Sequence, residues 1–151
     1  MAGEGQTGRS GDGPASVTSS RPLSLLVAED EEMNRILMRA ILARAPDARL
    51  REARLAEVET LVAARLMMDD PGTPIDLCLL DVQLADGSGL DLIPDLAART
   101  PRPRIVVMTA GVLSAQREAA EKAGCDAFIS KPYMPAELIA TILALVPAER
   151  V

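Results

Sequence analysis

The sequence predicts an α/β domain with five parallel strands and helices on both faces of the sheet. From residue 23 to 147, short apolar runs alternate with segments whose apolar residues recur every three or four positions. A nearly continuous apolar run at 75–80 indicates a strand buried on both faces. Strands that alternate with helices form parallel sheets, and right-handed crossovers cover both faces. A length of 151 residues suits one such domain and is too short for two.

The first half of the chain is expected to form three strands and two helices. In order, these are a strand at 23–28, a helix at 32–45, a strand at 49–53, a helix at 55–68 and a strand at 75–80. The first helix ends before Pro46, which cannot continue it. The strand at 49–53 is weak and polar, so we expect it near an edge of the sheet. The second helix ends at the turn-forming residues 69–72.

The second half is expected to form three helices and two strands. In order, these are a helix at 90–98, a strand at 104–109, a helix at 114–123, a strand at 127–130 and a helix at 135–145. The strand at 104–109 is rich in β-branched residues. Gly124 is expected to end the helix at 114–123, because glycine readily takes the conformation of a helix C-cap. Pro135 suits the first turn of the last helix.

The composition excludes several classes of function. A net charge of −6 with no basic run argues against direct nucleic-acid binding. The chain has no histidine, which excludes imidazole catalysis, histidine metal ligands and a phosphohistidine of its own. With Tyr133 and Phe128 as its two aromatic residues, a flavin-stacking or base-stacking site is not expected. Two distant cysteines predict reduced thiols in the cytoplasm, and no segment reaches the length of a membrane span.

Residues 1–22 differ in composition from the rest of the chain. They hold five of the ten glycines, several Ser and Thr residues, and Val17 as their single large aliphatic residue. Such a segment buries too little apolar surface to offset the entropy of ordering it. We therefore expect a disordered N-terminal tail at 1–22, followed by one domain at 23–147.

Charged and hydroxyl side chains follow the predicted strands at regular intervals. Glu29 and Asp30 follow the first strand, Asp81 the third, Thr109 the fourth and Lys131 the fifth. Because the carboxyl ends of parallel strands meet at one edge of a sheet, we expect these side chains to form one site. Each alone has a structural explanation, with Asp30 as a helix cap, Thr109 as a turn residue and Lys131 as a surface lysine. Their joint arrangement is what predicts a site.

The residue types at this edge indicate phosphoryl chemistry. Converging carboxylates repel one another unless a cation lies between them, and oxygen ligands without His or Cys suit Mg²⁺. A lysine supplies a compact positive charge for a phosphoryl oxygen, and a threonine hydroxyl supplies a directional donor. Asp81, in the middle, is placed to act as a nucleophile and form an acyl phosphate.

Five segments of the chain carry a specific pattern. They are Leu25–Asn34 with its acidic pair, Leu79–Leu90 around Asp81, Val107–Ala110, Ala123–Ala127 and Ser130–Tyr133. Together they resemble the receiver domain of bacterial two-component response regulators, of the single-domain chemotaxis-regulator type. The resemblance covers residues 23–147. It implies a flavodoxin-like (βα)5 fold whose five-stranded parallel sheet has the order 2-1-3-4-5.

The resemblance also implies a role for each residue of the site. Asp81 would be phosphorylated, and Thr109 and Lys131 would bind the phosphoryl oxygens. The Mg²⁺ ligands would be Glu29, Asp30, Asp81 and the backbone carbonyl of Gln83, with Glu29 acting directly or through water. Phe128 lies where the family carries its switch aromatic, which turns inward when Thr109 moves toward the phosphoryl group.

The chain departs from the family's pattern at three positions. Glu29 stands where Asp is commoner, and its longer side chain favours a shifted ion or a contact without water. Ala85 replaces a proline and is expected to loosen the loop after Asp81. Phe128 lacks the hydroxyl of a tyrosine, so a hydrogen bond cannot fix its inward state. None of these changes removes a catalytic group, so we expect an active receiver.

The expected function is that of a phospho-accepting receiver, and not of an enzyme beyond its own phosphorylation and dephosphorylation. The donor would be a phosphohistidine on a histidine kinase or a histidine phosphotransfer protein. The signal would pass to a downstream protein through an altered surface. No nucleic-acid or membrane binding is expected. The protein would be a monomer or a phosphorylation-dependent dimer.

Several alternatives stay open. The acidic segment 29–34 also resembles receivers attached to hybrid kinases, so a domain excised from such a kinase is one alternative, although the initiating Met favours an independent protein. An aspartyl-nucleophile phosphatase would carry its nucleophile after the first strand, whereas Asp81 follows the third. A flavodoxin-like electron carrier would need more aromatic side chains. An unphosphorylated adaptor is supported only by Glu29 and Ala85.

Overall fold

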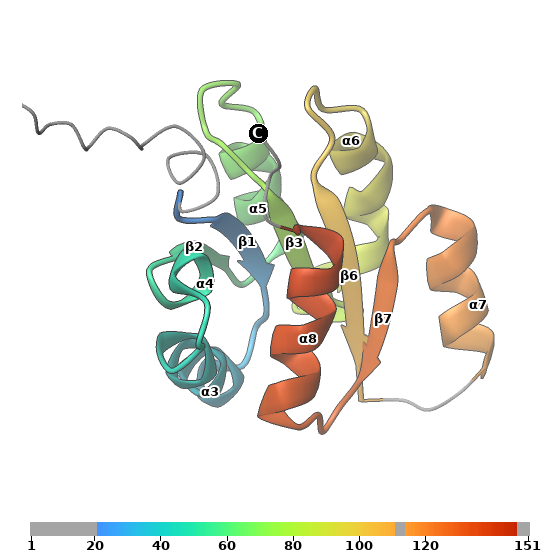
Figure 1. The fold of residues 1–151 in the computed structure, drawn as a ribbon. Helices are drawn as coiled ribbons and strands as arrows, with labels where there is room; N and C mark the ends of the chain where they lie inside the picture. Colours follow the sequence, from blue (N-terminus) through green and yellow to red (C-terminus); the bar gives the residue numbers. More distant parts are fainter. Residues whose placement is uncertain (1–20, 111–113, 148–151) are drawn as a thin grey trace, which may run out of the picture.

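The polypeptide folds into an α/β sandwich with a central sheet in the computed structural model, which describes residues 21–110 and 114–147 (Figure 1). Its elements are β1 (Ser24–Ala28), α3 (Glu32–Ala43), α4 (Ala48–Arg51), β2 (Arg54–Val58), α5 (Leu61–Met68), β3 (Leu77–Asp81), β4 (Gln83–Leu84), β5 (Gly87–Ser88), the 3₁₀ helix η1 (Gly89–Leu92), α6 (Ile93–Ala97), β6 (Arg104–Thr109), α7 (Ser114–Ala123), β7 (Ala127–Ser130) and α8 (Pro135–Leu145). The last four match their predicted bounds.

Most of the predicted tail, residues 1–20, lies outside the described residues. Arg21, at its end, forms an ion pair with Asp76 at 3.0 Å.

Five parallel strands form the main sheet in the order β2-β1-β3-β6-β7. Since β6 and β7 are the fourth and fifth strands of this sheet, the predicted order 2-1-3-4-5 and the flavodoxin-like fold are confirmed. In the middle of the sheet, Leu26 of β1 lies between Ala56 of β2 and Cys78 of β3. Every residue of β1 and β3 is buried, as continuous apolar runs predict.

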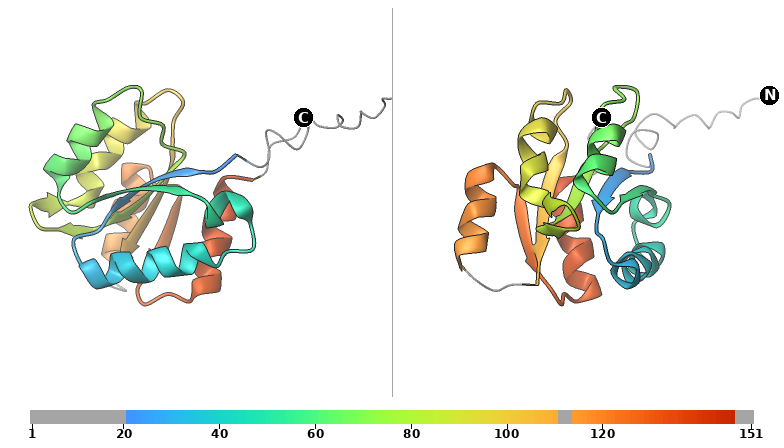
Figure 2. Two further views of the ribbon diagram at one scale, coloured as in Figure 1. Left: turned by 90° about the vertical axis from the view of Figure 1, so that its left-hand side faces the viewer. Right: turned by 180° about the vertical axis from the view of Figure 1, so that it is seen from behind.

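Helices cover both faces of the sheet (Figure 2), and a hydrophobic core lies on each face. On one face, α3 contributes Met38 and Leu42, and α8 contributes Leu138 and Ile142. The opposite core takes Ala64 and Met68 from α5, Ile93 and Leu96 from α6, and Ala120 from α7. Both faces of the central strands are therefore removed from water, which leaves the strand ends as the places where polar side chains can gather.

The second strand and the second helix lie elsewhere than predicted. Residues 49–53, predicted as a strand, lie largely in α4, and β2 occupies the start of the helix predicted at 55–68. Asp47 starts α4 by accepting a hydrogen bond from the backbone N–H of Arg49 at 2.8 Å. The actual second helix, α5, begins at its own cap, Thr60, whose hydroxyl accepts a backbone N–H at 3.0 Å. The second strand does lie at an edge of the sheet, as its polar sequence predicts.

A small antiparallel hairpin, β4–β5, follows β3 and was not predicted. It contains Ala85, and its tip carries Asp86. The Asp86 carboxylate accepts hydrogen bonds from the backbone N–H groups of Leu61 at 2.7 Å and Val62 at 3.2 Å, at the start of α5. These bonds lower the pKa of Asp86, and the bond from Leu61 has the larger effect. The hairpin is thereby fastened to a neighbouring helix.

The two cysteines, Cys78 and Cys125, are free thiols. Cys78 is fully buried in β3, where burial raises its thiol pKa to about 12. It therefore behaves as a small apolar side chain. Within the described part of the chain, no helix has the length and apolar character that crossing a bilayer requires.

Replacing Gly89 by Ala is expected to destabilise the protein by about 2 kcal/mol, because its Cβ would collide with the backbone carbonyl of Asp81. The collision is with backbone, so a change of rotamer cannot relieve it. Urea denaturation measures the effect. Gly72→Ala is the matched control, since a Cβ at Gly72 would meet its nearest neighbour at an ordinary 3.4 Å. Equal stabilities of the two variants would contradict the prediction.

Candidate functional site

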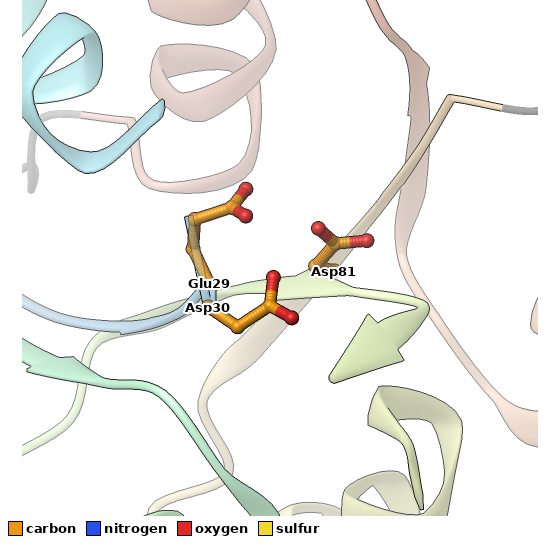
Figure 3. A group of neighbouring side chains, drawn as sticks. All are labelled: Glu29, Asp30 and Asp81. Atoms are coloured by element: carbon orange, nitrogen blue, oxygen red, sulfur yellow. The ribbon is translucent and has the colours of Figure 1, made fainter. Parts of the chain in front are cut away.

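The predicted site residues meet at the carboxyl edge of the sheet. Glu29 and Asp30 follow β1, Asp81 ends β3, Thr109 ends β6, and Lys131 follows β7. Each of the first three offers a carboxylate oxygen, and these oxygens lie within 4.8 Å of one another. Figure 3 shows the three carboxyl groups around one space above the sheet.

The turn after β1 is held by backbone contacts. The N–H of Glu29 donates to the carbonyl of Val58 at 2.9 Å, which prolongs the pairing of β1 with β2. The carbonyl of Glu29 accepts a hydrogen bond from Arg35 of α3 at 2.7 Å. The Glu29 carboxylate accepts the N–H of Glu31 at 3.2 Å. The acidic pair therefore sits on a fixed turn between a central strand and a packed helix.

Lys131 joins the two sides of the site. Its Nζ donates to Glu29 Oε1 at 2.7 Å and to Asp81 Oδ2 at 2.8 Å. The backbone N–H of Lys131 donates to the carbonyl of Thr109 at 2.7 Å, so the lysine is placed by the pairing of β7 with β6. The lysine thus bridges two carboxylates, one just after β1 and one at the end of β3.

Burial sets the electrostatics of the site. Glu29 is 1% exposed and Asp81 is 8% exposed. Burial raises the pKa of Asp81, although hydrogen bonds from Lys131 and the N–H of Gln83 oppose this. Burial pushes the pKa of Lys131 down, but hydrogen bonds to Asp81 and Glu29 outweigh it, so the lysine pKa is raised. Lys131 is therefore a firmly held cation beside a carboxylate that is costly to keep charged.

A cavity of about 460 Å³ opens over these groups. It is lined by Asp30, Glu31, Asn34, Asp81, Gln83, Thr109, Ala110, Gln116 and Lys131. Glu29 lies below this surface, in contact with Lys131. Gln83, whose carbonyl is a predicted metal ligand, lines the cavity, and its N–H donates to Asp81 Oδ1 at 3.1 Å. The cavity is large enough to admit a small anion to Asp81.

Thr109 has a neighbour that the sequence did not indicate. Its hydroxyl donates to Gln116 Oε1 of α7 at 2.9 Å. Phe128, the predicted switch aromatic, is half-buried in the core under α7, and Arg117 lies over its ring with Cζ 5.5 Å from the centroid. Gln116 was missed because helical spacing places it on α7 but does not show which strand end its amide reaches.

The donor set at this edge fits a hard divalent cation. Glu29, Asp30 and Asp81 supply oxygen ligands only, and among the residues that the structure describes Lys131 alone forms an ion pair with any of these three carboxylates. That imbalance leaves negative charge in the cavity, which suits Mg²⁺. The residues predicted to bind metal are therefore brought together.

A flavodoxin-like sheet that brings an acidic pair, a central aspartate and a lysine to one edge defines the receiver class of two-component signalling. The sequence agrees: residues 25–143 match the response regulator receiver domain family, and the chain belongs to that family. The predicted family and fold are confirmed.

Known proteins of this kind share the domain within longer chains. A segment of the aerobic respiration control sensor protein ArcB of Escherichia coli is 37% identical over 123 residues, which cover 80% of this chain and 15% of ArcB. The photosynthetic apparatus regulatory protein RegA of Rhodovulum sulfidophilum is 31% identical over 82% of this chain and 62% of RegA. The chain thus spans less than two thirds of either relative.

Solved structures show the same fold. A CheY-like receiver domain protein from Methanospirillum hungatei has a TM-score of 0.69 at 20% identity, covering 82% of this chain and 92% of that one. The receiver domain of a sensor histidine kinase from Pseudomonas aeruginosa has a TM-score of 0.68 at 22% identity, covering 84% and 99%. A magnesium ion is coordinated in the active-site cleft of that Pseudomonas domain.

Replacing Asp81 by Asn is expected to raise the free energy of unfolding at pH 7, on the order of 1 kcal/mol, when no Mg²⁺ is added. The substitution removes a carboxylate whose pKa burial has raised, and Lys131 keeps Glu29 as its partner. A folded-state pKa above the unfolded value means that the wild type gains stability as pH falls from neutral.

Urea denaturation at pH 7 and pH 5 tests this prediction. The advantage of Asp81→Asn should shrink at pH 5, because the wild-type carboxyl is then closer to its neutral form. Glu118→Gln, on the exposed face of α7, is the control for removing an acidic charge and should show little change. An Asp81→Asn variant less stable than wild type at both pH values would contradict the prediction.

Proposed function

We propose that this receiver accepts a phosphoryl group on Asp81 from the phosphohistidine of a histidine kinase or a histidine phosphotransfer protein, in a reaction that requires Mg²⁺. The proposal rests on one contact above all, that of Lys131 Nζ with Asp81 Oδ2 at 2.8 Å. This contact lies in a cavity where Asp30 is within 4.8 Å of the same carboxylate. The two free thiols support a cytoplasmic location.

The proposed reaction is an in-line displacement at phosphorus. A carboxylate oxygen of Asp81 forms a bond to phosphorus while the P–N bond of the phosphohistidine breaks. The bonding electron pair leaves with the imidazole, which takes up a proton. Lys131 stays bound to the aspartate and donates a hydrogen bond to one phosphoryl oxygen, and Thr109 donates to another. Water later hydrolyses the acyl phosphate and regenerates Asp81.

The residues that would hold Mg²⁺ are Asp30, Asp81, the backbone carbonyl of Gln83 and Glu29. The cation would offset the negative charge that the phosphoryl group adds to an already acidic cavity. Of the three clustered carboxylates, Asp30 and Asp81 line the cavity, whereas Glu29 does not and is paired with Lys131. We therefore expect Asp30 and Asp81 to dominate the binding of the ion.

An apolar surface beside the cavity supports a protein as the phosphoryl donor. On α3, Met33 is 74% exposed, Leu37 is 53% exposed, and Ile36 is also exposed. A second cavity of about 330 Å³ extends between Leu37 and Tyr133 and reaches Lys131. Exposed apolar groups of this kind favour contact with a partner protein that brings its phosphohistidine to the site.

A receiver that works within a sensor kinase is the second candidate. The 37% identity to a segment of the sensor protein ArcB favours it. The phosphorylation chemistry is the same in both cases, and only the covalent relation to the kinase differs. Phosphotransfer to this domain from a separately purified phosphotransfer protein, compared with transfer from a fused kinase core, would distinguish the two.

Phosphorylation by phosphoramidate, a small phosphodonor with a P–N bond, is expected to require Mg²⁺ and both cavity-facing aspartates. Asp81→Asn removes the nucleophile and should abolish the phosphorylated species. Asp30→Asn removes a charged metal ligand and should weaken Mg²⁺ binding and phosphorylation at least tenfold, since loss of even an outer-shell partner of a metal site costs about tenfold or more. Intact-protein mass spectrometry and isothermal titration with Mg²⁺ measure these effects.

Asp69→Asn is the matched control for that experiment, because Asp69 is an exposed carboxylate at the far end of α5. It should leave Mg²⁺ binding and phosphorylation unchanged. Unaltered phosphorylation of Asp30→Asn would remove Asp30 from the site. Phosphorylation of Asp81→Asn at the wild-type rate would disprove the proposed acceptor.

Phosphorylation at Asp81 is expected to rearrange the face built from α7, β7 and α8, which would carry the signal to a downstream protein. A dianion beside Lys131 favours an inward Thr109, and Phe128 then fills the space that Thr109 leaves. NMR spectra recorded with and without beryllofluoride and Mg²⁺ should show shifts at Phe128 and along α7. Helix α4 serves as the internal reference. Shifts confined to the surroundings of Asp81 would contradict this switch and favour a passive phosphate sink.

A further inference from the structure

Two neighbouring residues of α7 each contact one of the two predicted switch residues. Gln116 accepts the hydroxyl hydrogen of Thr109 at 2.9 Å, and Arg117 lies over the ring of Phe128 with Cζ 5.5 Å from its centroid. In the pairing of β6 with β7, Phe128 lies opposite Val107. Thr109 is two residues beyond Val107, so Thr109 and Phe128 face the same side of the sheet, beneath α7.

The hydrogen bond to Gln116 competes directly with the proposed reaction. Thr109 is 3% exposed, and its hydroxyl carries a single hydrogen. A hydrogen donated to Gln116 cannot at the same time be donated to a phosphoryl oxygen. Gln116 also lines the cavity above Asp81, so both acceptors lie within reach of the same side chain.

We propose that Gln116 is a positioning residue, which holds Thr109 in its resting orientation and so opposes phosphorylation of Asp81. The inference rests on the proposed function, since it assigns the regulation of that same site. Thr109 binds a phosphoryl oxygen only after it releases Gln116. Release removes a contact that α7 makes with Thr109. Gln116 therefore sets how readily the resting receiver adopts its phosphorylated arrangement.

Gln116→Met tests the proposal in the full chain. Methionine has nearly the shape of glutamine and a similar helix propensity, but it offers no amide acceptor. The affinity for beryllofluoride in the presence of Mg²⁺ should rise about fivefold, the factor that corresponds to the net contribution of one hydrogen bond. Glu118→Ala, on the exposed surface of the same helix, is the control and should leave that affinity unchanged.

A double-mutant cycle shows whether Gln116 acts through Thr109. In a Thr109→Val background the hydroxyl is absent, so Gln116→Met should then have no effect on beryllofluoride affinity. A second readout needs neither metal nor phosphoryl analogue. Three-bond NMR couplings of Thr109 should show a different distribution of side-chain rotamers in metal-free Gln116→Met than in the metal-free wild type.

The outcomes separate the inference from the proposed function. Unchanged or weaker beryllofluoride affinity in Gln116→Met, a gain that persists with Thr109→Val, or unaltered Thr109 couplings would each overturn the positioning role while Asp81 phosphorylation still stood. A wild-type chain that neither binds beryllofluoride nor becomes phosphorylated would overturn the proposed function and the inference with it.

Discussion

The ammonium group of Lys131, held between the carboxylates of Glu29 and Asp81, is the interaction on which the rest of the site depends. Three carboxylates at one edge of a sheet repel one another, and two of them are almost fully buried. Without a cation in contact with them, their burial would cost several kcal/mol. Lys131 meets this need from the opposite end of the sequence, since 102 positions separate it from Glu29. The contact requires that all strands between them keep their register.

The glutamate at position 29 gives this contact a particular form. Its Oε1 accepts from Lys131 at 2.7 Å and its Oε2 accepts from the N–H of Glu31 at 3.2 Å. One carboxylate therefore both anchors the lysine and closes its own turn. The acidic side chains that line the cavity are Asp30, Glu31 and Asp81 instead. Within the acidic pair, Glu29 is thus a buried counter-ion of Lys131, and Asp30 is the carboxylate that a ligand in the cavity can reach.

The sequence placed the site residues together because of one regularity, the return of each parallel strand to the same edge, whereas the sheet order came from the resemblance to the receiver family. Asp81, Thr109 and Lys131 all lie where that regularity places them. It was less informative at the sheet edge. Strand β2 is only partly covered, so its residues lack the apolar pattern that marks a buried strand, and the cap at Asp47 starts a helical turn just before it.

Two further features depended on contacts between distant parts of the chain. The β4–β5 hairpin is too short to leave a periodic pattern. It is stabilised by the hydrogen bond that Asp86 accepts from Leu61, which lies 25 residues earlier at the start of α5. The bond between Thr109 and Gln116 depends on how α7 lies against β6. Local sequence spacing carries no information about either arrangement, because each depends on the packing of whole elements.

The hairpin fastened to α5 gives the domain a stiff side and a compliant side. On the side of β4 and β5, the loop after Asp81 is tied to a helix by two backbone hydrogen bonds, and Gly89 packs directly against the carbonyl of Asp81. On the side of β6 and β7, Thr109 and Lys131 contact Gln116 and Asp81 through side-chain hydrogen bonds. A structural change at Asp81 would therefore displace groups on the side of β6 and β7 and leave the β4–β5 hairpin in place. Because one side stays fixed, the displacement would have a single direction.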